Sequence, residues 1–104
     1  MYIVHIMRVG KVNFEWNEGK NDLNKKKHGV DFREAATIFL NSPIRIFFDP
    51  DHSEDEERYV AIGISINSRT LVVVHCESLE GITVRIISAR KATKQEQRLL
   101  HGGV

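Results

Sequence analysis

The sequence predicts an α+β domain, with two N-terminal helices and a short C-terminal helix packed on an antiparallel sheet of about four to five strands. Three observations predict this class. Residues 17–40 contain helix start and stop signals and one apolar stripe at helical spacing. Residues 44–90 contain short apolar runs separated by turn-like segments. A helix-capping sequence follows at residues 93–96. A chain of 104 residues has room for one core, so residues 1–104 should form a single domain.

The first predicted helix begins after a short strand end at residues 14–16, with Asn17 as its N-cap. It should stop one or two residues before Gly29, which favours helix ends. Leu23 is the only large apolar residue in the body of this helix. We therefore expect a surface helix that is anchored through Trp16 and Leu23 and turns its lysines to solvent.

The second predicted helix is the best-determined element of the chain. Asp31 and Glu34 begin it with an approximation to a capping box. A continuous apolar stripe follows at helical spacing, made of Phe32, Ala35, Ala36, Phe39 and Leu40. An Asn-Ser-Pro sequence at residues 41–43 should end the helix.

The apolar period then changes to that of strands. Four runs rich in Ile, Val, Phe and Tyr follow, at residues 44–48, 58–66, 70–77 and 83–90. Turn-like pairs separate the last three runs, which should therefore form an antiparallel meander. The run at residues 71–74 is apolar on both faces, as expected of a central strand. Thr93 and Glu96 then form a capping box for the C-terminal helix, whose apolar contacts are Leu99 and Leu100.

The charge is balanced overall but unevenly distributed. A formal net charge of +1 gives no bulk attraction to nucleic acid. Residues 49–57 contain six acidic residues and no lysine or arginine, so the rest of the chain carries 15 basic residues against 8 acidic ones. If the fold gathers these basic groups on one face, they form a site for a polyanion. A scattered, solvated surface is the alternative.

The single cysteine and the terminal sequence indicate the compartment. Cys76 alone cannot form an internal disulfide, which is typical of proteins in a reducing environment. No stretch approaches the length of a bilayer span, and the opening residues lack the order of a signal peptide. We therefore expect a soluble cytoplasmic protein with no membrane partner.

Several motifs then occur in a characteristic order. They are FEWNxxKxxxNxxKHGVxF at residues 14–32, EAATIFL at 34–40, DPDHSxxExR at 49–58, VxxG at 60–63, VVVH at 72–75 and RIISARKAT at 85–93. With these motifs the chain resembles the BrnT family of bacterial toxins over residues 14–100. Residues 1–13 precede the match and are an extension, either an upstream start or an added strand.

The resemblance implies a RelE-like fold and a ribonuclease toxin of a type II toxin–antitoxin system. Such a toxin cleaves RNA, inhibits translation and is neutralised by a ribbon-helix-helix antitoxin of the BrnA kind. We expect an antitoxin dimer to hold two toxins and to bind the operator DNA itself, and we expect no cofactor. The alternative is a non-catalytic module that binds only its antitoxin or nucleic acid. A metal-dependent nuclease or phosphatase is a third possibility.

Metal-independent RNA cleavage needs a base, cationic donors for the phosphate and an acid for the leaving oxygen. Histidine suits both proton transfers because its ordinary pKa is about 6.5. Arginine suits the phosphate because its planar fork of donors stays charged. The candidate catalytic residues are Arg58, Arg90, His28, His75 and Glu57. The candidate RNA-binding residues are Lys20, Lys27, Arg85 and Lys91.

Strand alternation predicts where the arginines face. Arg90 should share a face with Val84 and Ile86, whereas Arg85 should lie on the opposite face. Arg58 should end an apolar row on its own strand. Arg58 and Arg90 would then lie at the margin of the sheet, where a charged group can reach a cleft. A structural salt bridge is the alternative for each arginine.

Each remaining candidate also has two interpretations. His28 follows a helix whose dipole favours its protonated form, suited to an acid or a phosphate ligand, but it could simply cap the helix. His75 ends a central apolar strand and could instead be a satisfied core group. Glu57 is a candidate base or orienting partner, or half of a plain salt bridge. Lys20 and Lys27 share one side of their helix and could steer RNA, although a solvated helix face is simpler.

The acidic loop has groups that can bind a metal, among them Asp49, Asp51 and His52. It lacks the glycine of an EF-hand, and no second histidine stands at helical spacing. We therefore predict no metal site. Cys76 has no evident catalytic neighbour in the sequence and should pack as a small apolar group.

Overall fold

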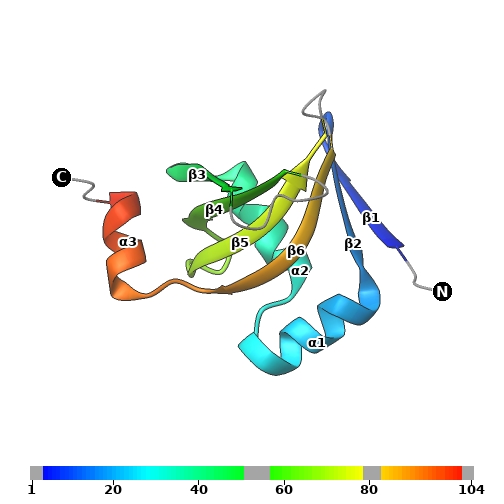
Figure 1. Ribbon diagram of the computed structural model, residues 1–104, viewed down its shortest axis with the longest axis horizontal. Coiled ribbons are helices and arrows are strands. Elements are labelled where there is room, and N and C mark those ends of the chain that lie inside the picture. Colours follow the sequence, from blue (N-terminus) through cyan, green and yellow to red (C-terminus); the bar gives the residue numbers. More distant parts are fainter. Residues whose placement is uncertain (1–3, 51–56, 79–82, 102–104) are drawn as a thin grey trace.

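The computed structural model describes residues 4–50, 57–78 and 83–101. Its elements are β1 (Val4–Val9), β2 (Val12–Asn17), α1 (Glu18–His28), α2 (Phe32–Ala36), the 3₁₀-helix η1 (Thr37–Leu40), β3 (Ile44–Asp49), β4 (Arg58–Ile64), β5 (Thr70–Glu77), β6 (Thr83–Lys91) and α3 (Lys94–His101). Within these residues six strands form one sheet in the order β1-β2-β6-β5-β4-β3 (Figure 1). Neighbouring strands pair antiparallel, except that β2 and β6 pair parallel.

The α+β class is confirmed, but the expectation of an antiparallel sheet of about four to five strands is wrong. β1 and β2 add a hairpin to the edge of the meander, in which Val9 pairs with Val12 across a tight turn. Gly10 in that turn has a φ of 60°, a conformation that glycine adopts without strain. Val4–Val9 of the extension thus form an added strand, which was one of the two expectations for it. Its partner β2 then lies parallel to β6, which makes the sheet mixed.

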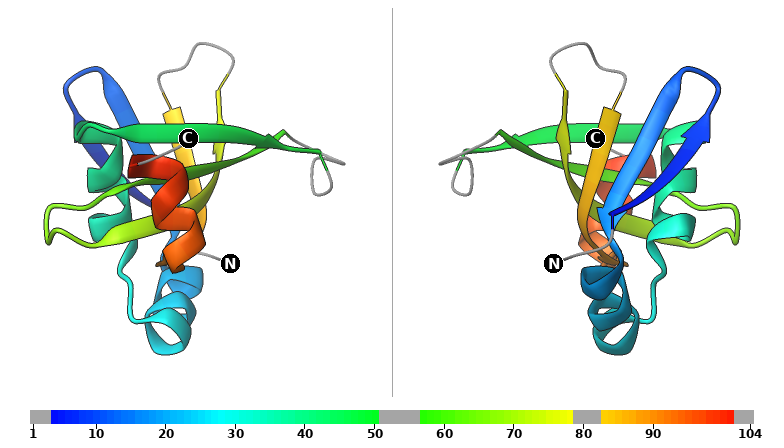
Figure 2. Two further views of the ribbon diagram at one scale, coloured as in Figure 1. Left: turned by 90° about the vertical axis from the view of Figure 1, so that its left-hand side faces the viewer. Right: turned by 90° about the vertical axis from the view of Figure 1, so that its right-hand side faces the viewer.

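The helices cover both faces of the sheet. The main core includes Phe14 of β2, Phe32 of α2, Ile38 of η1 and Val73 of β5, all fully buried. On the other face Leu100 of α3 packs with Ile62 and Val72 in a smaller core, and Figure 2 shows α3 in front of the sheet in one side view. Since Val72 and Val73 are neighbours on β5, they point to opposite faces. The α2–η1 segment and α3 therefore pack on opposite sides of the sheet.

The predicted ends of α1 are confirmed, but its predicted anchor is wrong. The Lys20 amide donates to Oδ1 of Asn17 at 3.0 Å, and Gly29 ends the helix with a φ of 69°. Trp16 is buried in the main core, as expected, whereas Leu23 is 67% exposed. The face that α1 turns to the protein is polar.

Asn24 attaches α1 to β6 through its side-chain amide. The Ala89 amide donates to Oδ1 of Asn24 at 3.1 Å, and Nδ2 of Asn24 donates to the Ala89 carbonyl at 2.8 Å. Nδ2 also donates to the Val30 carbonyl at 2.9 Å. The paired part of β2 reaches only to Arg85 of β6, so the Asn24 amide bonds to β6 beyond that point as a strand would. Figure 1 shows α1 next to β6.

The α2–η1 segment departs from the predicted apolar stripe at its C-terminal end. Phe32, Ala35 and Ala36 are buried as predicted, whereas Leu40 is 50% exposed. From Thr37 the helix tightens to about three residues per turn, which rotates the following side chains relative to an α-helix. Consequently Ile38, which the α-helical pattern left outside the stripe, is fully buried.

The start of α2 also differs from the approximate capping box. Asp31 caps the helix, because its Oδ1 accepts from the Arg33 amide at 2.8 Å. Glu34 instead forms an ion pair with Arg69, which follows the β4–β5 turn. The Ser65 hydroxyl donates to the same carboxylate at 2.6 Å. The guanidinium of Arg69 is the main reason that the pKa of Glu34 is lowered. Glu34 therefore ties α2 to the β4–β5 turn.

Asn24→Ala should destabilise the protein by about 2–4 kcal/mol, because it leaves buried backbone groups of Val30 and Ala89 without their partner. Leu23→Ala is the matched control on the same helix and should change the free energy of unfolding by less than about 0.5 kcal/mol. Urea unfolding measures both variants. A larger loss of stability in Leu23→Ala than in Asn24→Ala would show that Leu23, and not Asn24, holds α1 on the sheet.

Candidate functional site

A bulge in β6 changes the strand alternation halfway along its length. Val74 of β5 pairs with Ser88, but the next residue, His75, pairs with Ile86. Ile87 is therefore the extra residue in the ladder. A register shift of one residue exchanges the faces to which the following side chains point.

The bulge places two arginines of β6 on the same face. Arg85 pairs with Cys76, and Arg90 pairs with Val72. Cys76 and Val72 are four residues apart on β5, so their side chains share a face. The prediction that Arg85 and Arg90 face opposite ways is therefore wrong, because simple alternation fails at the bulge. Ile86, which was expected beside Arg90, is instead buried in the main core.

Arg58 joins them from the neighbouring strand. It pairs with Cys76 from the β4 side, so the thiol lies between Arg58 and Arg85 in one row across the sheet. Asp49 of β3 and Glu15 of β2 continue the row at its two ends. Nη2 of Arg85 lies 4.0 Å from Sγ of Cys76. We call the sheet face that carries Arg58, Arg85 and Arg90 the arginine face.

Cys76 is buried within this row rather than available as a nucleophile. Only 7% of its surface is exposed. Burial raises the pKa of its thiol, and the nearby charge of Arg58 offsets only part of that effect. Cys76 therefore packs as a small group between two guanidinium groups, in agreement with the structural role expected for it.

Arg90 also holds the start of α3. Its Nη1 and Nη2 donate to the two carboxylate oxygens of Glu96, each at 2.8 Å. Glu96 accepts from the Thr93 amide at 2.8 Å, and its own amide donates to Oγ1 of Thr93 at 3.2 Å, so the predicted capping box is confirmed. The hydrogen bonds from Arg90 are the main reason that the pKa of Glu96 falls from 4.5 to about 2. A salt bridge, the structural alternative, is thus present at Arg90.

His75 lies on the opposite face, inside an aromatic cluster. Its ring is fully buried, with the Phe39 ring edge-on at 4.9 Å and the Tyr59 ring stacked at 5.9 Å. Its Nε2 lies 2.8 Å from a carboxylate oxygen of Glu77. The Tyr59 hydroxyl donates to Glu57 at 3.1 Å, and this bond is the main cause of a raised Tyr59 pKa. His75 and Glu57 are therefore not brought together with the arginines.

Tyr59 is a member of this cluster that the sequence analysis missed. It pairs with His75 across β4 and β5, and this pairing depends on the register of the sheet. The sequence gives one signal for this position. Tyr59 lies two residues before the buried Ala61 on β4, so the two side chains share a face of the sheet. A register argument needs the partner strand, which the sequence alone does not supply.

His28, Lys20 and Lys27 line a shallow pocket of about 220 Å³ beside β6. Its other lining residues are Leu23, Asn24, Ile87 and Ser88. The expectation that Lys20 and Lys27 share one side of α1 agrees with this geometry. We call this hollow the α1 pocket. Lys91, the remaining RNA-binding candidate, is exposed at the end of β6.

The α1 pocket adjoins the arginine face through β6. Ser88 lines the pocket and lies between Arg85 and Arg90 in the sequence of that strand. At about 3.3 Å per residue, the two arginines are displaced along β6 by roughly 7–10 Å from Ser88. Among the predicted acid–base candidates, His28 therefore lies in the pocket that borders the arginines.

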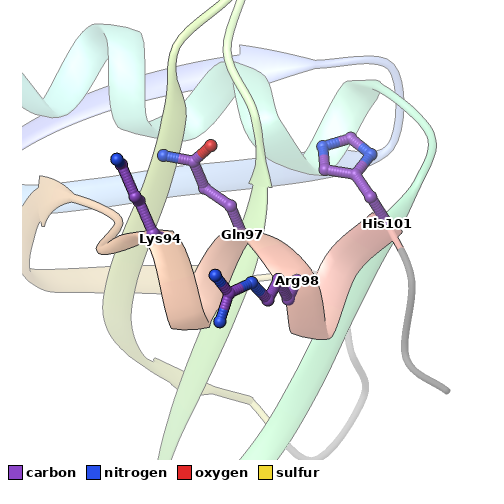
Figure 3. Close-up of a pocket in the computed structure, with 4 residues that line it drawn as sticks. All are labelled: Lys94, Gln97, Arg98 and His101. Carbon is purple, nitrogen blue, oxygen red and sulfur yellow. The ribbon is translucent and has the colours of Figure 1, made fainter.

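A second basic surface lies on α3. Lys94, Gln97, Arg98 and His101 of α3 line an open hollow of about 480 Å³ (Figure 3). Their spacing of three and four residues places them along one side of the helix. The sequence analysis assigned His101 no role. Because Leu100 packs with Val72, and Val72 pairs with Arg90, α3 lies on the same side of the sheet as the arginine face.

Among residues 4–50, 57–78 and 83–101, no three His, Cys, Asp or Glu side chains come together in a way that could hold a metal ion. Asp51 and His52 of the acidic loop lie outside these residues. Within the same ranges, no helix has the length and apolar character needed to cross a membrane.

Comparisons with known proteins agree with this fold. A family model described as "Ribonuclease toxin, BrnT, of type II toxin-antitoxin system" matches residues 16–96. The crystal structure of the Brucella abortus ribonuclease toxin BrnT is 23% identical, and the alignment covers 76% of this chain and 94% of that chain with a TM-score of 0.56. At this identity the structural likeness shows the fold. A comparison with curated proteins found no match.

The Arg90–Glu96 ion pair predicts a specific pH dependence of stability. The pKa of Glu96 is lowered to about 2 in the folded protein, from an ordinary value of 4.5. The ionised carboxylate therefore adds its full contribution to the free energy of unfolding above pH 4.5, and this contribution is lost as the pH falls through about 2. Glu96→Gln should remove this dependence and lower the free energy of unfolding at pH 7 by about 1 kcal/mol, since partial exposure of Arg90 screens the pair. Unfolding by urea across this pH range measures both effects.

Asp22→Asn is the control for this experiment. Asp22 forms a surface pair with Lys25 at 4.0 Å, and its side chain is 65% exposed. Its removal should leave the stability and its pH dependence nearly unchanged. If Glu96→Gln kept the same acid sensitivity as the wild type, the pair would not form in solution.

Proposed function

Since the chain belongs to the BrnT family of ribonuclease toxins of type II toxin–antitoxin systems, we propose that it is a RelE-like, metal-independent endoribonuclease of the cytoplasm that inhibits translation. The observation that carries this proposal is the arginine face. Three guanidinium-bearing residues from β4 and β6 share one side of the sheet because of the bulge at Ile87. Guanidinium groups suit a phosphodiester because they stay charged and offer paired donors.

Arg58 and Arg85 are assigned to the scissile phosphate. They flank Cys76 in one row, so a phosphate placed above the thiol meets donors from both sides. In the reaction, the 2′-oxygen of the ribose attacks phosphorus, and the bond from phosphorus to the 5′-oxygen breaks. Charge grows on the phosphate oxygens during this step, and fixed cations stabilise it. Arg90 assists from the start of α3, where Glu96 orients it.

His28 is the proton-transfer residue that this geometry favours. It lines the α1 pocket together with Ser88 of β6, whereas His75 and Glu57 lie in a cluster on the other side of the sheet. One imidazole can accept the proton of the 2′-hydroxyl or donate to the leaving 5′-oxygen. Lys20, Lys27 and Lys91 are assigned to more distant phosphates of the RNA.

Membership of a type II system implies an antitoxin partner, and we propose a ribbon-helix-helix antitoxin of the BrnA kind. An antitoxin dimer would hold two copies of this chain and keep its own ribbon free for operator DNA. A tight interface buries about 1,600 Å² in total, which on a domain of this size would cover much of the arginine face. Neutralisation would then follow from direct occlusion.

A non-catalytic binding module is the second candidate, and two contacts favour it. Arg90 is engaged by both oxygens of Glu96, and His75 is fully buried against Tyr59 and Phe39. In that case the arginine face would bind RNA or the antitoxin without cleaving anything. Activity measurements distinguish the two candidates.

The purified protein should cleave single-stranded RNA in EDTA, and Arg58→Ala and Arg85→Ala should each lower kcat/KM by about a hundredfold. The reason is the loss of a fixed cation beside the phosphate. Cleavage of a short RNA, followed by gel or mass analysis of its products, measures the effect. Arg33→Ala is the control, because this arginine belongs to α2 and not to the arginine face. Its guanidinium lies 5.5 Å from the centroid of the Trp16 ring.

Two outcomes would contradict this proposal. Loss of cleavage in EDTA with recovery on adding a divalent metal would show a metal-dependent mechanism. Full activity in both arginine variants would remove the arginine face from the reaction. Binding of RNA without any cleavage would instead support the non-catalytic module.

Hydrogen exchange on the free and antitoxin-bound protein should show protection at residues 20–28, at Arg58 and at residues 85–91. This pattern follows from an antitoxin that covers the arginine face and the adjoining α1 pocket. The bound complex should have the mass of two copies of this chain on one antitoxin dimer. Protection confined to other segments would mean that neutralisation works without covering the proposed site.

A further inference from the structure

Leu23 is exposed on a helix that would ordinarily bury its one large apolar residue. It is 67% exposed, whereas two asparagines of the same helix, Asn21 and Asn24, are buried. Asn21 accepts from the Phe32 amide at 2.9 Å, and Asn24 bonds to Ala89 of β6. Because the asparagines hold the helix in place, Leu23 is not needed for packing. Its side chain is therefore available to a ligand.

The residues around Leu23 form a pocket that is apolar in one part and positively charged in another. Leu23 and Ile87 give the α1 pocket an apolar part, and Lys20 and Lys27 give it positive charge. Lys25 lies outside this lining and pairs with acidic groups instead, at 4.0 Å from Asp22 and 3.8 Å from Asp31. An apolar surface beside lysines matches the apolar ring and the charged phosphate of a nucleotide.

The size and position of the pocket indicate which part of an RNA chain it could hold. Its volume of about 220 Å³ is smaller than the roughly 300–1,000 Å³ of sites for whole drug-sized ligands, so it holds one part of a longer molecule. It opens beside Ser88, two residues from Arg90 on β6. The same bulge that gathers the arginines also turns Ile87 toward α1. The pocket is thus placed for a nucleotide near the one that the arginines would hold.

We propose that the α1 pocket is a subsite for one unpaired base of a single-stranded RNA, packed on Leu23 and Ile87 while Lys20 and Lys27 bind the adjacent phosphates. This inference rests on the proposed function of the arginine face. It adds a requirement for an unpaired nucleotide beside the cleavage position. A base held in a duplex cannot enter the pocket, so single-stranded RNA is the substrate class.

The test uses a short single-stranded RNA with methylated 2′-oxygens, which binds but has no nucleophile for cleavage. Abasic nucleotides are introduced one position at a time, and affinity is measured by fluorescence anisotropy for the wild type and for Leu23→Ala. At one position the abasic change should weaken wild-type binding about five- to tenfold and have little effect on Leu23→Ala. Ile66→Ala is the matched control, because Ile66 is 73% exposed in the β4–β5 turn.

The outcomes separate this inference from the proposed ribonuclease activity. If Leu23→Ala binds every RNA of the series as the wild type does, the subsite is wrong, whatever the cleavage assay shows. If Leu23→Ala lowers all affinities equally, Leu23 does not contact a base, and the subsite is also wrong. A loss of antitoxin binding in Leu23→Ala with unchanged RNA binding would assign the surface to the protein partner. The expected position-specific pattern would support the subsite even if no cleavage were found.

Discussion

The arrangement of this domain depends on the hydrogen bonds that the backbone of β6 makes on the side away from β5. Its first residues pair with β2, and beyond Arg85 the Asn24 amide bonds to both backbone groups of Ala89. A buried strand edge without partners is unfavourable, so the position of α1 is set by hydrogen bonds rather than by apolar area. The consequence is a helix that lies beside the sheet, with lysines and one leucine facing outward. Both proposed RNA-contacting surfaces border the same strand.

Local signals in the sequence were sufficient for much of the fold. The Asn17 cap, the Gly29 stop and the Thr93–Glu96 box were predicted from short patterns, because capping depends on residues within one turn. The features that were missed depend on distant partners. Apolar spacing favours Leu23 as the anchor of α1, whereas the helix is held by Asn24, whose bonds to Ala89 reach across 65 residues. Such a distant partner leaves no signal in the local pattern. The parallel pairing of β2 with β6 is equally non-local.

The candidate site was predictable in its residue types but not in its geometry. Arginines of β4 and β6 were singled out because of their charge at strand ends, and three of them do share a face. Their common face could not be predicted, since a single bulge residue reverses the alternation on which the argument rested. His75 is fully buried in an aromatic cluster that only the pairing of β4 with β5 reveals. Residue chemistry identifies candidates, whereas register decides which of them can act together.

The central claim is that RNA is bound on the arginine face rather than on the face of the His75 cluster. The most direct measurement is an NMR titration with a non-cleavable single-stranded RNA, observing the side-chain Nε–H signals of the arginines and the ring signals of Tyr59 and His75. The account predicts that Arg58, Arg85 and Arg90 signals shift on binding, while Arg69, paired with Glu34, stays unchanged. Shifts centred on Tyr59 and His75, with the three arginines unaffected, would contradict it.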